Sequence, residues 1–283
     1  MSKVFTAIAC LSFIILAFTS PQDFVTHARN GMSLFAFNVL PILFPFFFVT
    51  GLLVELDLFK HPKFKRSGII MMSFLSGSPT SARILSQLYI RGDITRDQAI
   101  KTATFTTTTS PVFIIATLGT VLYQDVTIGI LIFIAHILGA VANGILYSFF
   151  PAKQSPLNHE PIKPSTPLNV SDAISKSLNS AIQNILAVGG LVVIFFIVSA
   201  SMPLPIAAVL EMTTGVFRAE AVTQGMWRAI IACAIVSFGG ICVAMQSFVF
   251  FRTFQMPVGF YFLYKTTHTV FAVIFLAVIL HIA

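Results

Sequence analysis

Long apolar runs alternate with short polar connections along this chain. The runs at 35–58, 127–149 and 259–282 are each long enough to cross a bilayer core of about 30 Å, which takes roughly 20 helical residues. Further apolar runs at 105–122 and 185–200 are interrupted or somewhat shorter. The pattern predicts a series of membrane-spanning helices.

One apolar stretch is too short to cross a membrane and has basic residues on both sides. The runs at 67–77 and 80–90 are about eleven residues each, or roughly 16 Å of helix. Between them, Gly77-Ser78-Pro79 supplies turn-forming residues. Because basic connections favour the cytoplasmic side, the chain is expected to enter the membrane and return as a re-entrant helical hairpin at 67–90.

Two later stretches are also interrupted. The sequence TTTTSPVF breaks the run at 105–122, and Pro111 lacks the N–H group that would bond to the carbonyl oxygen of Thr107. In the second half, Gly239-Gly240 separates two half-length apolar runs, which predicts a second hairpin at 228–254.

The chain divides into two halves, in which Ser73-Phe74 and Ser237-Phe238 precede the breaks. An odd number of crossings between the halves would invert one relative to the other. The predicted fold is therefore an all-α polytopic membrane protein with two inverted repeats, each with a re-entrant or broken helical hairpin. The expected parts are an N-terminal helix and connection at 1–33, a first repeat at 34–150, a cytoplasmic linker at 151–170 and a second repeat at 171–283. The apolar run at 4–19 is interpreted as a retained first helix, with a cleaved signal peptide as the alternative.

The composition agrees with a membrane location. Of the 283 residues 56% are hydrophobic and 10% are charged, and the mean hydropathy is +0.90. Soluble domains carry roughly 25% charged residues, so a lipid bilayer must cover this surface. The net charge of +7 falls mainly in the connections, which indicates topology rather than a nucleic-acid partner. The three cysteines and six histidines form no disulfide or metal-binding pattern, and no enzyme motif or resident cofactor is expected.

The first hairpin carries candidate substrate-binding residues. Irregular backbone survives in a bilayer only when it is buried in protein or lines a polar cavity. A helix that starts after Pro79 would direct its N-terminal N–H groups into such a cavity, with Thr80, Arg83 and Gln87 on one face. This arrangement suits a carboxylate, and the alternative is a tight turn whose arginine reaches the interface or pairs with an acid.

Glu211 is the candidate for ion coupling. It lies in the apolar run at 203–217, which is expected to form one helix, and a carboxylate in such a run is costly to bury. The hydroxyls of Thr213 and Thr214 would add oxygen ligands for Na⁺, and proton coupling is equally open. The alternative is a helix-end residue that reaches water near the charges at 218 and 220.

The last helix carries Lys265, with His268 and Thr269 on the same face. Lys265 is interpreted as a substrate ligand, with an ion pair to Glu211 or a position at the interface as alternatives. Hydroxyls near Pro111 either line the cavity or bond back to their own helix. The complete candidate set for substrate binding is Ser78, Thr80, Ser81, Arg83, Gln87, Thr107, Thr108, Ser110, Gly239, Gly240, Gln246 and Lys265.

These motifs resemble a known family. The stretch SGSPTSARILSQLYIRGDITRDQAIKTATFTTTTSPVFIIATLG is similar to the signature of the YlbJ (SpoVV) family of sporulation integral membrane proteins. In the second half, EMTTG at 211–215 and SFGGICVAMQ at 237–246 resemble that family's E-x-T-N-G and S-F-G-G-x-x-V-x-x-Q motifs. Lys265 matches a lysine in the family's final helix.

The resemblance implies a fold of the nucleoside-recognition or Gate-domain group, similar to concentrative nucleoside transporters. It also implies transport of dipicolinic acid across the outer forespore membrane. The chain departs from the family pattern at Ser81, at Arg83 and at Thr107-Thr108, where the family has Gly, Lys and Asn-Asn. The leading hypothesis is a secondary transporter of a small anionic compound, with homo-oligomers possible. The alternatives are a nucleoside transporter of the same fold and a non-transporting membrane scaffold in spore assembly.

Overall fold

The computed structural model describes residues 11, 13–15, 17–56, 67–150 and 169–282, and these residues form helices and connections with no strand among them. Most of the helix expected at 4–19, the basic cluster at 60–66 and nearly all of the linker lie outside the described residues. The all-α fold is confirmed.

Four helical segments in the described part of the chain are long and apolar enough to cross a membrane. They are α7 (Val126–Ser148), α8 (Val170–Ala200), the broken segment Met226–Phe254 and α13 (Val258–Ile282). A fifth candidate is the pair Pro21–Val39 and Leu43–Glu55, which meet at a bend of 49°. The polytopic membrane architecture expected from the apolar pattern is therefore present.

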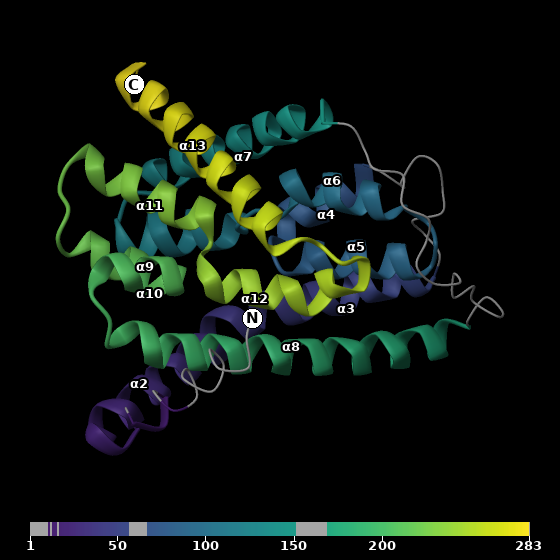
Figure 1. Cartoon of the computed structure of the whole chain (residues 1–283), viewed down its shortest axis with the longest axis horizontal. Coiled ribbons are helices and arrows are strands. Elements are labelled where there is room, and N and C mark those ends of the chain that lie inside the picture. The colour runs from purple at the N-terminus through teal and green to yellow at the C-terminus, as the bar shows by residue number, and fades with distance from the viewer. Residues whose placement is uncertain (1–10, 12, 16, 57–66, 151–168, 283) are drawn as a thin grey trace.

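The same order of elements occurs twice. A long helix is followed by a pair of short helices, a broken helix and a second long helix (Figure 1). The first half, after α2 (Pro21–Leu34) and η1 (Phe35–Val39), consists of α3 (Leu40–Glu55), α4 (Ser67–Ser76), α5 (Thr80–Ile90), α6 (Arg96–Thr106), η3 (Val112–Leu122) and α7. The second half consists of α8, α9 (Leu204–Leu210), α10 (Met212–Glu220), α11 (Met226–Phe238), α12 (Gly240–Phe251), η4 (Arg252–Phe254) and α13.

The long helices pack in pairs across the two halves, α3 against α8 and α7 against α13. In Figure 1, α8 extends along one side of the molecule with α3 beside it, while α13 crosses α7 on the other side. Small residues permit the second contact, since a Cβ atom on Gly139 would lie 2.7 Å from the backbone nitrogen of Ala272. The short and broken helices lie between these two pairs.

The two half-length helices predicted on either side of Gly77-Ser78-Pro79 are present as α4 and α5. Helices α4 and α5 contact each other and are separated by Gly77, whose φ of +71° is a conformation that glycine adopts readily. The break near Pro111 is also present, with α6 ending at Thr106 and η3 beginning at Val112. Helix α6 begins earlier than expected, because Thr95 and Gln98 form a reciprocal capping box at its N-terminus.

The second half differs from the prediction in two places. The expected single helix at 203–217 is interrupted at Glu211, whose extended backbone (φ −143°, ψ 118°) separates α9 from α10. These two helices pack on each other and form the short pair of the second half. The hairpin expected at 228–254 is not what the structure contains, because α11, α12 and η4 form one broken span. Two consecutive left-handed glycines, Gly239 and Gly240, interrupt the helix there without turning the chain back.

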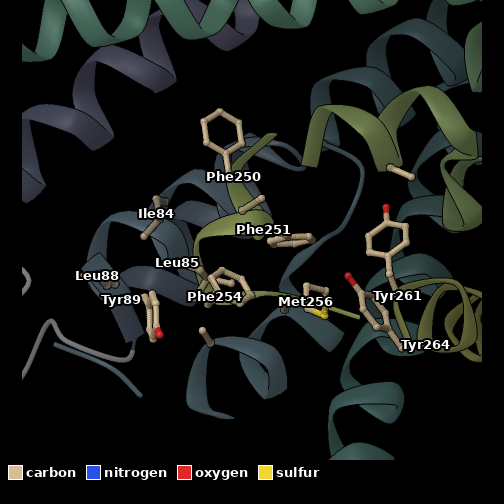
Figure 2. Packing of buried hydrophobic residues seen from close by; sticks show 14 of the residues in the cluster. Ile84, Leu85, Leu88, Tyr89, Phe250, Phe251, Phe254, Met256, Tyr261 and Tyr264 are labelled. Atoms are coloured by element: carbon tan, nitrogen blue, oxygen red, sulfur yellow. The ribbon is translucent and has the colours of Figure 1, made fainter. Parts of the chain in front are cut away.

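An aromatic cluster joins the two halves of the molecule (Figure 2). The ring of Phe254 lies 5.9 Å from that of Tyr89 on α5, and 5.3 Å from that of Phe251 on α12. Tyr261 on α13 continues the row, 6.1 Å from Phe251 and 5.1 Å from Tyr264. Each ring buries a large apolar area, so this cluster fixes α5 against α12 and α13.

Candidate functional site

The connection between the helices of each short pair, at 77–79 in α4–α5 and at Glu211 in α9–α10, is called its tip. A cavity of about 90 Å³ lies where these two tips meet the broken helices. One water molecule needs roughly 10–15 Å³ on this scale, so the cavity has room for several waters or a small solute. Its apolar wall includes side chains from α3, α8 and α12. Its polar wall consists of Asn38, Ser78, Thr107, Thr108, Thr109, Ser110, Glu211, Thr213, Gln246 and Lys265.

The tip of the first short pair rests on the first helix break. The N–H group of Ser78 donates to the carbonyl oxygen of Thr108 at 2.7 Å. A Cβ atom on Gly77 would lie 2.7 Å from the backbone nitrogen of Ser110, so only glycine permits this approach. The hydroxyl of Ser78 also lies 2.8 Å from that of Ser247 on α12, which links the tip to the second half.

The tip of the second short pair rests on the second break in the same manner. A Cβ atom on Gly240 would lie 3.1 Å from the carbonyl oxygen of Val209, at the end of α9. The carboxylate of Glu211 caps α10, accepting from the N–H groups of Thr213 at 3.0 Å and Thr214 at 2.6 Å. Glu211 is 4% exposed and lines the cavity, so its charge is held at the cavity wall by the end of a helix.

Lys265 is the basic residue of the cavity wall. It is 2% exposed, and its Nζ donates to the carbonyl oxygen of Thr107 at 3.0 Å. This is the carbonyl left without an i+4 donor by Pro111. Among the described residues no ion pair joins Lys265 to Glu211, so the two ionisable groups of the site are separate.

Nine of the predicted substrate-binding and ion-coupling residues do line this cavity. Each lies at a tip, at a break or on the face of α12 or α13 that closes the site. They are Ser78, Thr107, Thr108, Ser110, Glu211, Thr213, Gly239, Gln246 and Lys265. The Oγ1 atom of Thr108 is buried without a hydrogen-bond partner, which leaves one polar group of the wall available to a ligand.

Arg83 lies elsewhere, contrary to the sequence prediction. Its guanidinium donates to the carbonyl oxygen of Phe47 on α3 and, at 3.0 Å, to the hydroxyl of Ser180 on α8. It lies 5.3 Å from the centre of the Phe47 ring and is 1% exposed. The face of α5 that carries Arg83 is turned toward α3 and α8 rather than toward the cavity, so Arg83 binds neighbouring helices.

Five further predicted residues are outside the cavity wall: Thr80, Ser81, Gln87, Gly240 and Thr214. The hydroxyls of Thr80 and Ser81 and the Oε1 atom of Gln87 are buried without a hydrogen-bond partner. Thr214 accepts from the hydroxyl of Ser199 at 3.2 Å, which ties α10 to α8. Of these five residues, Thr214 and Gly240 contact neighbouring elements of the site.

Sequence reasoning missed two buried polar residues on α7. His136 contacts both helix breaks, with bonds to Thr109 and Ser237. The amide nitrogen of Asn143 donates to the carbonyl oxygens of Thr104 at 2.8 Å and Tyr264 at 3.1 Å. The signal was their spacing of seven residues on one face of an apolar span, because polar residues in spans face the protein interior.

The comparisons with known proteins give one relative. The chain is 27% identical over 231 residues to the sporulation integral membrane protein YlbJ of Bacillus subtilis (strain 168). The match covers 69% of this chain and 56% of that protein, so it spans about half the length of the relative. No protein-family model matches the chain, and no solved structure matches it.

The integral membrane relative and the four apolar helices together place this protein in a membrane. The motifs at 76–119 and 211–246 predict the same relationship that the comparison finds. The match therefore supports membership of this chain in the family of sporulation integral membrane proteins to which YlbJ belongs.

Proposed function

We propose that this protein is a secondary transporter that moves a small anionic solute across a membrane, with dipicolinate as the first candidate. The observation that carries the proposal is the cavity in which Lys265 and Glu211 are buried without forming an ion pair. Ionisable residues within membrane-spanning segments are costly, and those that face a cavity commonly mark a solute or ion pathway.

In this proposal the short helix pairs α4–α5 and α9–α10 re-enter the membrane, and their tips meet near the middle of the bilayer. The two halves have opposite orientation. Three features support this arrangement: the repeated order of elements, the short length of the paired helices and the contact of each tip with the broken helix of its own half. Discontinuous helices that meet at a central site are typical of secondary transporters with inverted repeats.

Lys265 would bind a carboxylate group of the solute. An ammonium group has three donors, and the carbonyl oxygen of Thr107 accepts from one of them. The remaining donors, with the unpartnered hydroxyl of Thr108, would hold a carboxylate by charge-assisted hydrogen bonds. Dipicolinate is a planar dicarboxylate and is the solute that the resemblance to the sporulation family implies.

Glu211 would couple transport to a cation. Its two oxygens each accept one backbone N–H, and further lone pairs remain for Na⁺ or a proton. Thr213 lines the cavity next to it. Binding of the cation to Glu211 would thereby be linked to movement of the tip between α9 and α10.

The test is binding and uptake of labelled dipicolinate by the purified chain, in detergent and in proteoliposomes. Lys265→Gln should lower the affinity at least tenfold, because a charge-assisted hydrogen bond contributes about 1.5–3 kcal/mol. The matched control is Lys176→Gln, since Lys176 is an exposed lysine that pairs with Glu55 at 2.8 Å away from the cavity. Its affinity should remain that of the wild type.

Uridine serves as the comparison solute. Saturable uridine binding without dipicolinate binding would replace the proposed anion by a nucleoside. A folded protein that binds neither compound would contradict both transport assignments and favour a scaffold in spore assembly.

A further inference from the structure

We propose that His136 is a positioning residue that couples the two helix breaks of the cavity. It lies on α7, is fully buried and does not line the cavity, so it acts on the site through other residues. The proposal deepens the proposed function, on which it rests for its consequence for transport, but the coupling itself is independent of the solute.

The first link runs to the break between α6 and η3. The backbone N–H group of Thr109 donates to Nε2 of His136 at 3.0 Å. A backbone nitrogen can only donate, so Nε2 must be the unprotonated nitrogen of a neutral imidazole. The imidazole therefore accepts a hydrogen bond from the backbone amide of a residue that lies outside the helices.

The second link runs to the break between α11 and α12. In the neutral ring Nδ1 carries the proton, and it donates to the hydroxyl of Ser237, 2.8 Å away. Ser237 lies two residues before Gly239, at the end of α11. One rigid ring thus contacts the unwound segment of the first half and the last turn before the break of the second half.

A direct contact accompanies this bridge. The hydroxyl of Thr109 donates to the carbonyl oxygen of Val236 at 2.8 Å, so the two break regions also touch each other. The ring of His268 lies 4.7 Å from that of His136, and its Nε2 bonds to the His136 carbonyl oxygen at 3.0 Å. Lys265 precedes His268 by about one turn of α13, so the contacts of His268 with His136 also hold the helical segment that carries the lysine.

The geometry explains why a histidine suits this position. Its two nitrogens are fixed on opposite sides of one ring, one as acceptor and one as donor. An asparagine amide reaches about as far as Nδ1, and a glutamine amide reaches about as far as Nε2, so each replaces one link only. His136→Asn retains the Ser237 link, and His136→Gln retains the Thr109 link.

Hydrogen–deuterium exchange of the full chain in detergent tests the coupling without any solute. Both variants should raise exchange about tenfold in the segments 107–110 and 237–241, since loss of one hydrogen bond opens a structure by about that factor. Ser237→Ala, which removes the second link from the other side, should give the same two-segment change. Asn143→Ala is the matched control, because Asn143 is buried on the same face of α7 and contacts neither break.

Two exchange outcomes would overturn the proposal. One is an increase confined to the segment whose own bond was removed, and the other is the same pattern in Asn143→Ala.

Dipicolinate uptake adds a second measurement, in which the His136 variants should lower the maximal rate about tenfold and change KM less than twofold. A rise in KM at constant maximal rate would make His136 a binding residue and overturn the positioning role. If the wild type moves no dipicolinate, the proposed solute fails while the exchange result still decides the coupling.

Discussion

The Nζ atom of Lys265 lies 3.0 Å from the carbonyl oxygen of Thr107, so α13 is bonded to the break between α6 and η3. Pro111 removes the amide that would normally bond to this oxygen, and an ammonium from the other half of the protein takes its place. The same contact satisfies a buried carbonyl group and holds a positive charge at the cavity wall. One hydrogen bond thus joins the break between α6 and η3 to the candidate binding group, Lys265.

A first prediction concerns access to this break. In a background without the native cysteines, Thr108→Cys should react with a small charged thiol reagent, because Thr108 lines the cavity. Thr104→Cys is the control, since Thr104 is equally buried but lies outside the cavity wall. Labelling rates in proteoliposomes should differ at least about tenfold, and bound solute should slow the reaction at Thr108→Cys. Equal rates would show that the cavity is closed to water.

A second prediction distinguishes the carboxylate cap at Glu211, which lines the cavity, from the carboxylate cap at Asp125, which does not. Glu211→Gln retains one acceptor oxygen for the N-terminus of α10 and should lower stability by no more than about 1 kcal/mol. It should abolish the dependence of uptake on an imposed Na⁺ or proton gradient. Asp125→Asn changes the equivalent cap of α7, which accepts from Thr127 at 2.8 Å outside the cavity, and should leave this dependence intact. Gradient-driven uptake that survives in Glu211→Gln would refute the coupling role.

A third prediction concerns the contact within the second short pair. A Cβ atom on Gly215 would lie 2.5 Å from the Cα atom of Ala208, so Gly215→Ala must force α9 and α10 apart. Overpacking of this kind costs about 1–3 kcal/mol. Gly190→Ala is the matched control, because no atom lies within 4 Å of its added Cβ, and alanine favours a helix by about 0.5–1 kcal/mol. Thermal unfolding in detergent should show opposite shifts for the two variants, and similar shifts would contradict the packing argument.

A fourth prediction tests the position of Arg83. Arg83→Met removes the guanidinium bonds to the carbonyl oxygen of Phe47 and to the hydroxyl of Ser180, which should lower the free energy of unfolding by about 1–3 kcal/mol. Ser180→Ala, which removes only the second bond, should cost less. Dipicolinate affinity should change less than twofold in both variants. A large loss of affinity in Arg83→Met, with intact folding, would restore Arg83 to the binding site.

Much of the fold was predictable from local chemistry. The two half-length helices around Gly77-Ser78-Pro79 are present, because glycine and proline at that spacing end one helix and start another. The break before Pro111 follows from the missing N–H group in the same way. Lys265 and Glu211 were recognised because ionisable residues in apolar runs are rare.

The second half was harder, because its two interruptions are ambiguous in sequence. Gly239-Gly240 suggested a turn, yet the span continues through it, whereas the apolar run around Glu211 suggested a continuous helix, yet the chain folds back there. Both local conformations are accessible to these residues. The contact of Gly215 with Ala208 and the approach of Gly240 to Val209 depend on residues far enough apart that only packing selects them.

The sequence by itself determined the membrane class, the family resemblance and the places where helices can break. It also identified the ionisable residues whose burial is so costly that a functional role was expected. Only the tertiary structure decided which of these residues meet. Successive helical residues differ by about 100° in direction, so a small rotation of a helix decides which side chains face a cavity. Packing of α5 on α3, with the bond from Arg83 to Ser180 on α8, turned Arg83 away from the cavity, and packing of α13 on α7 and α11 turned Lys265 toward it.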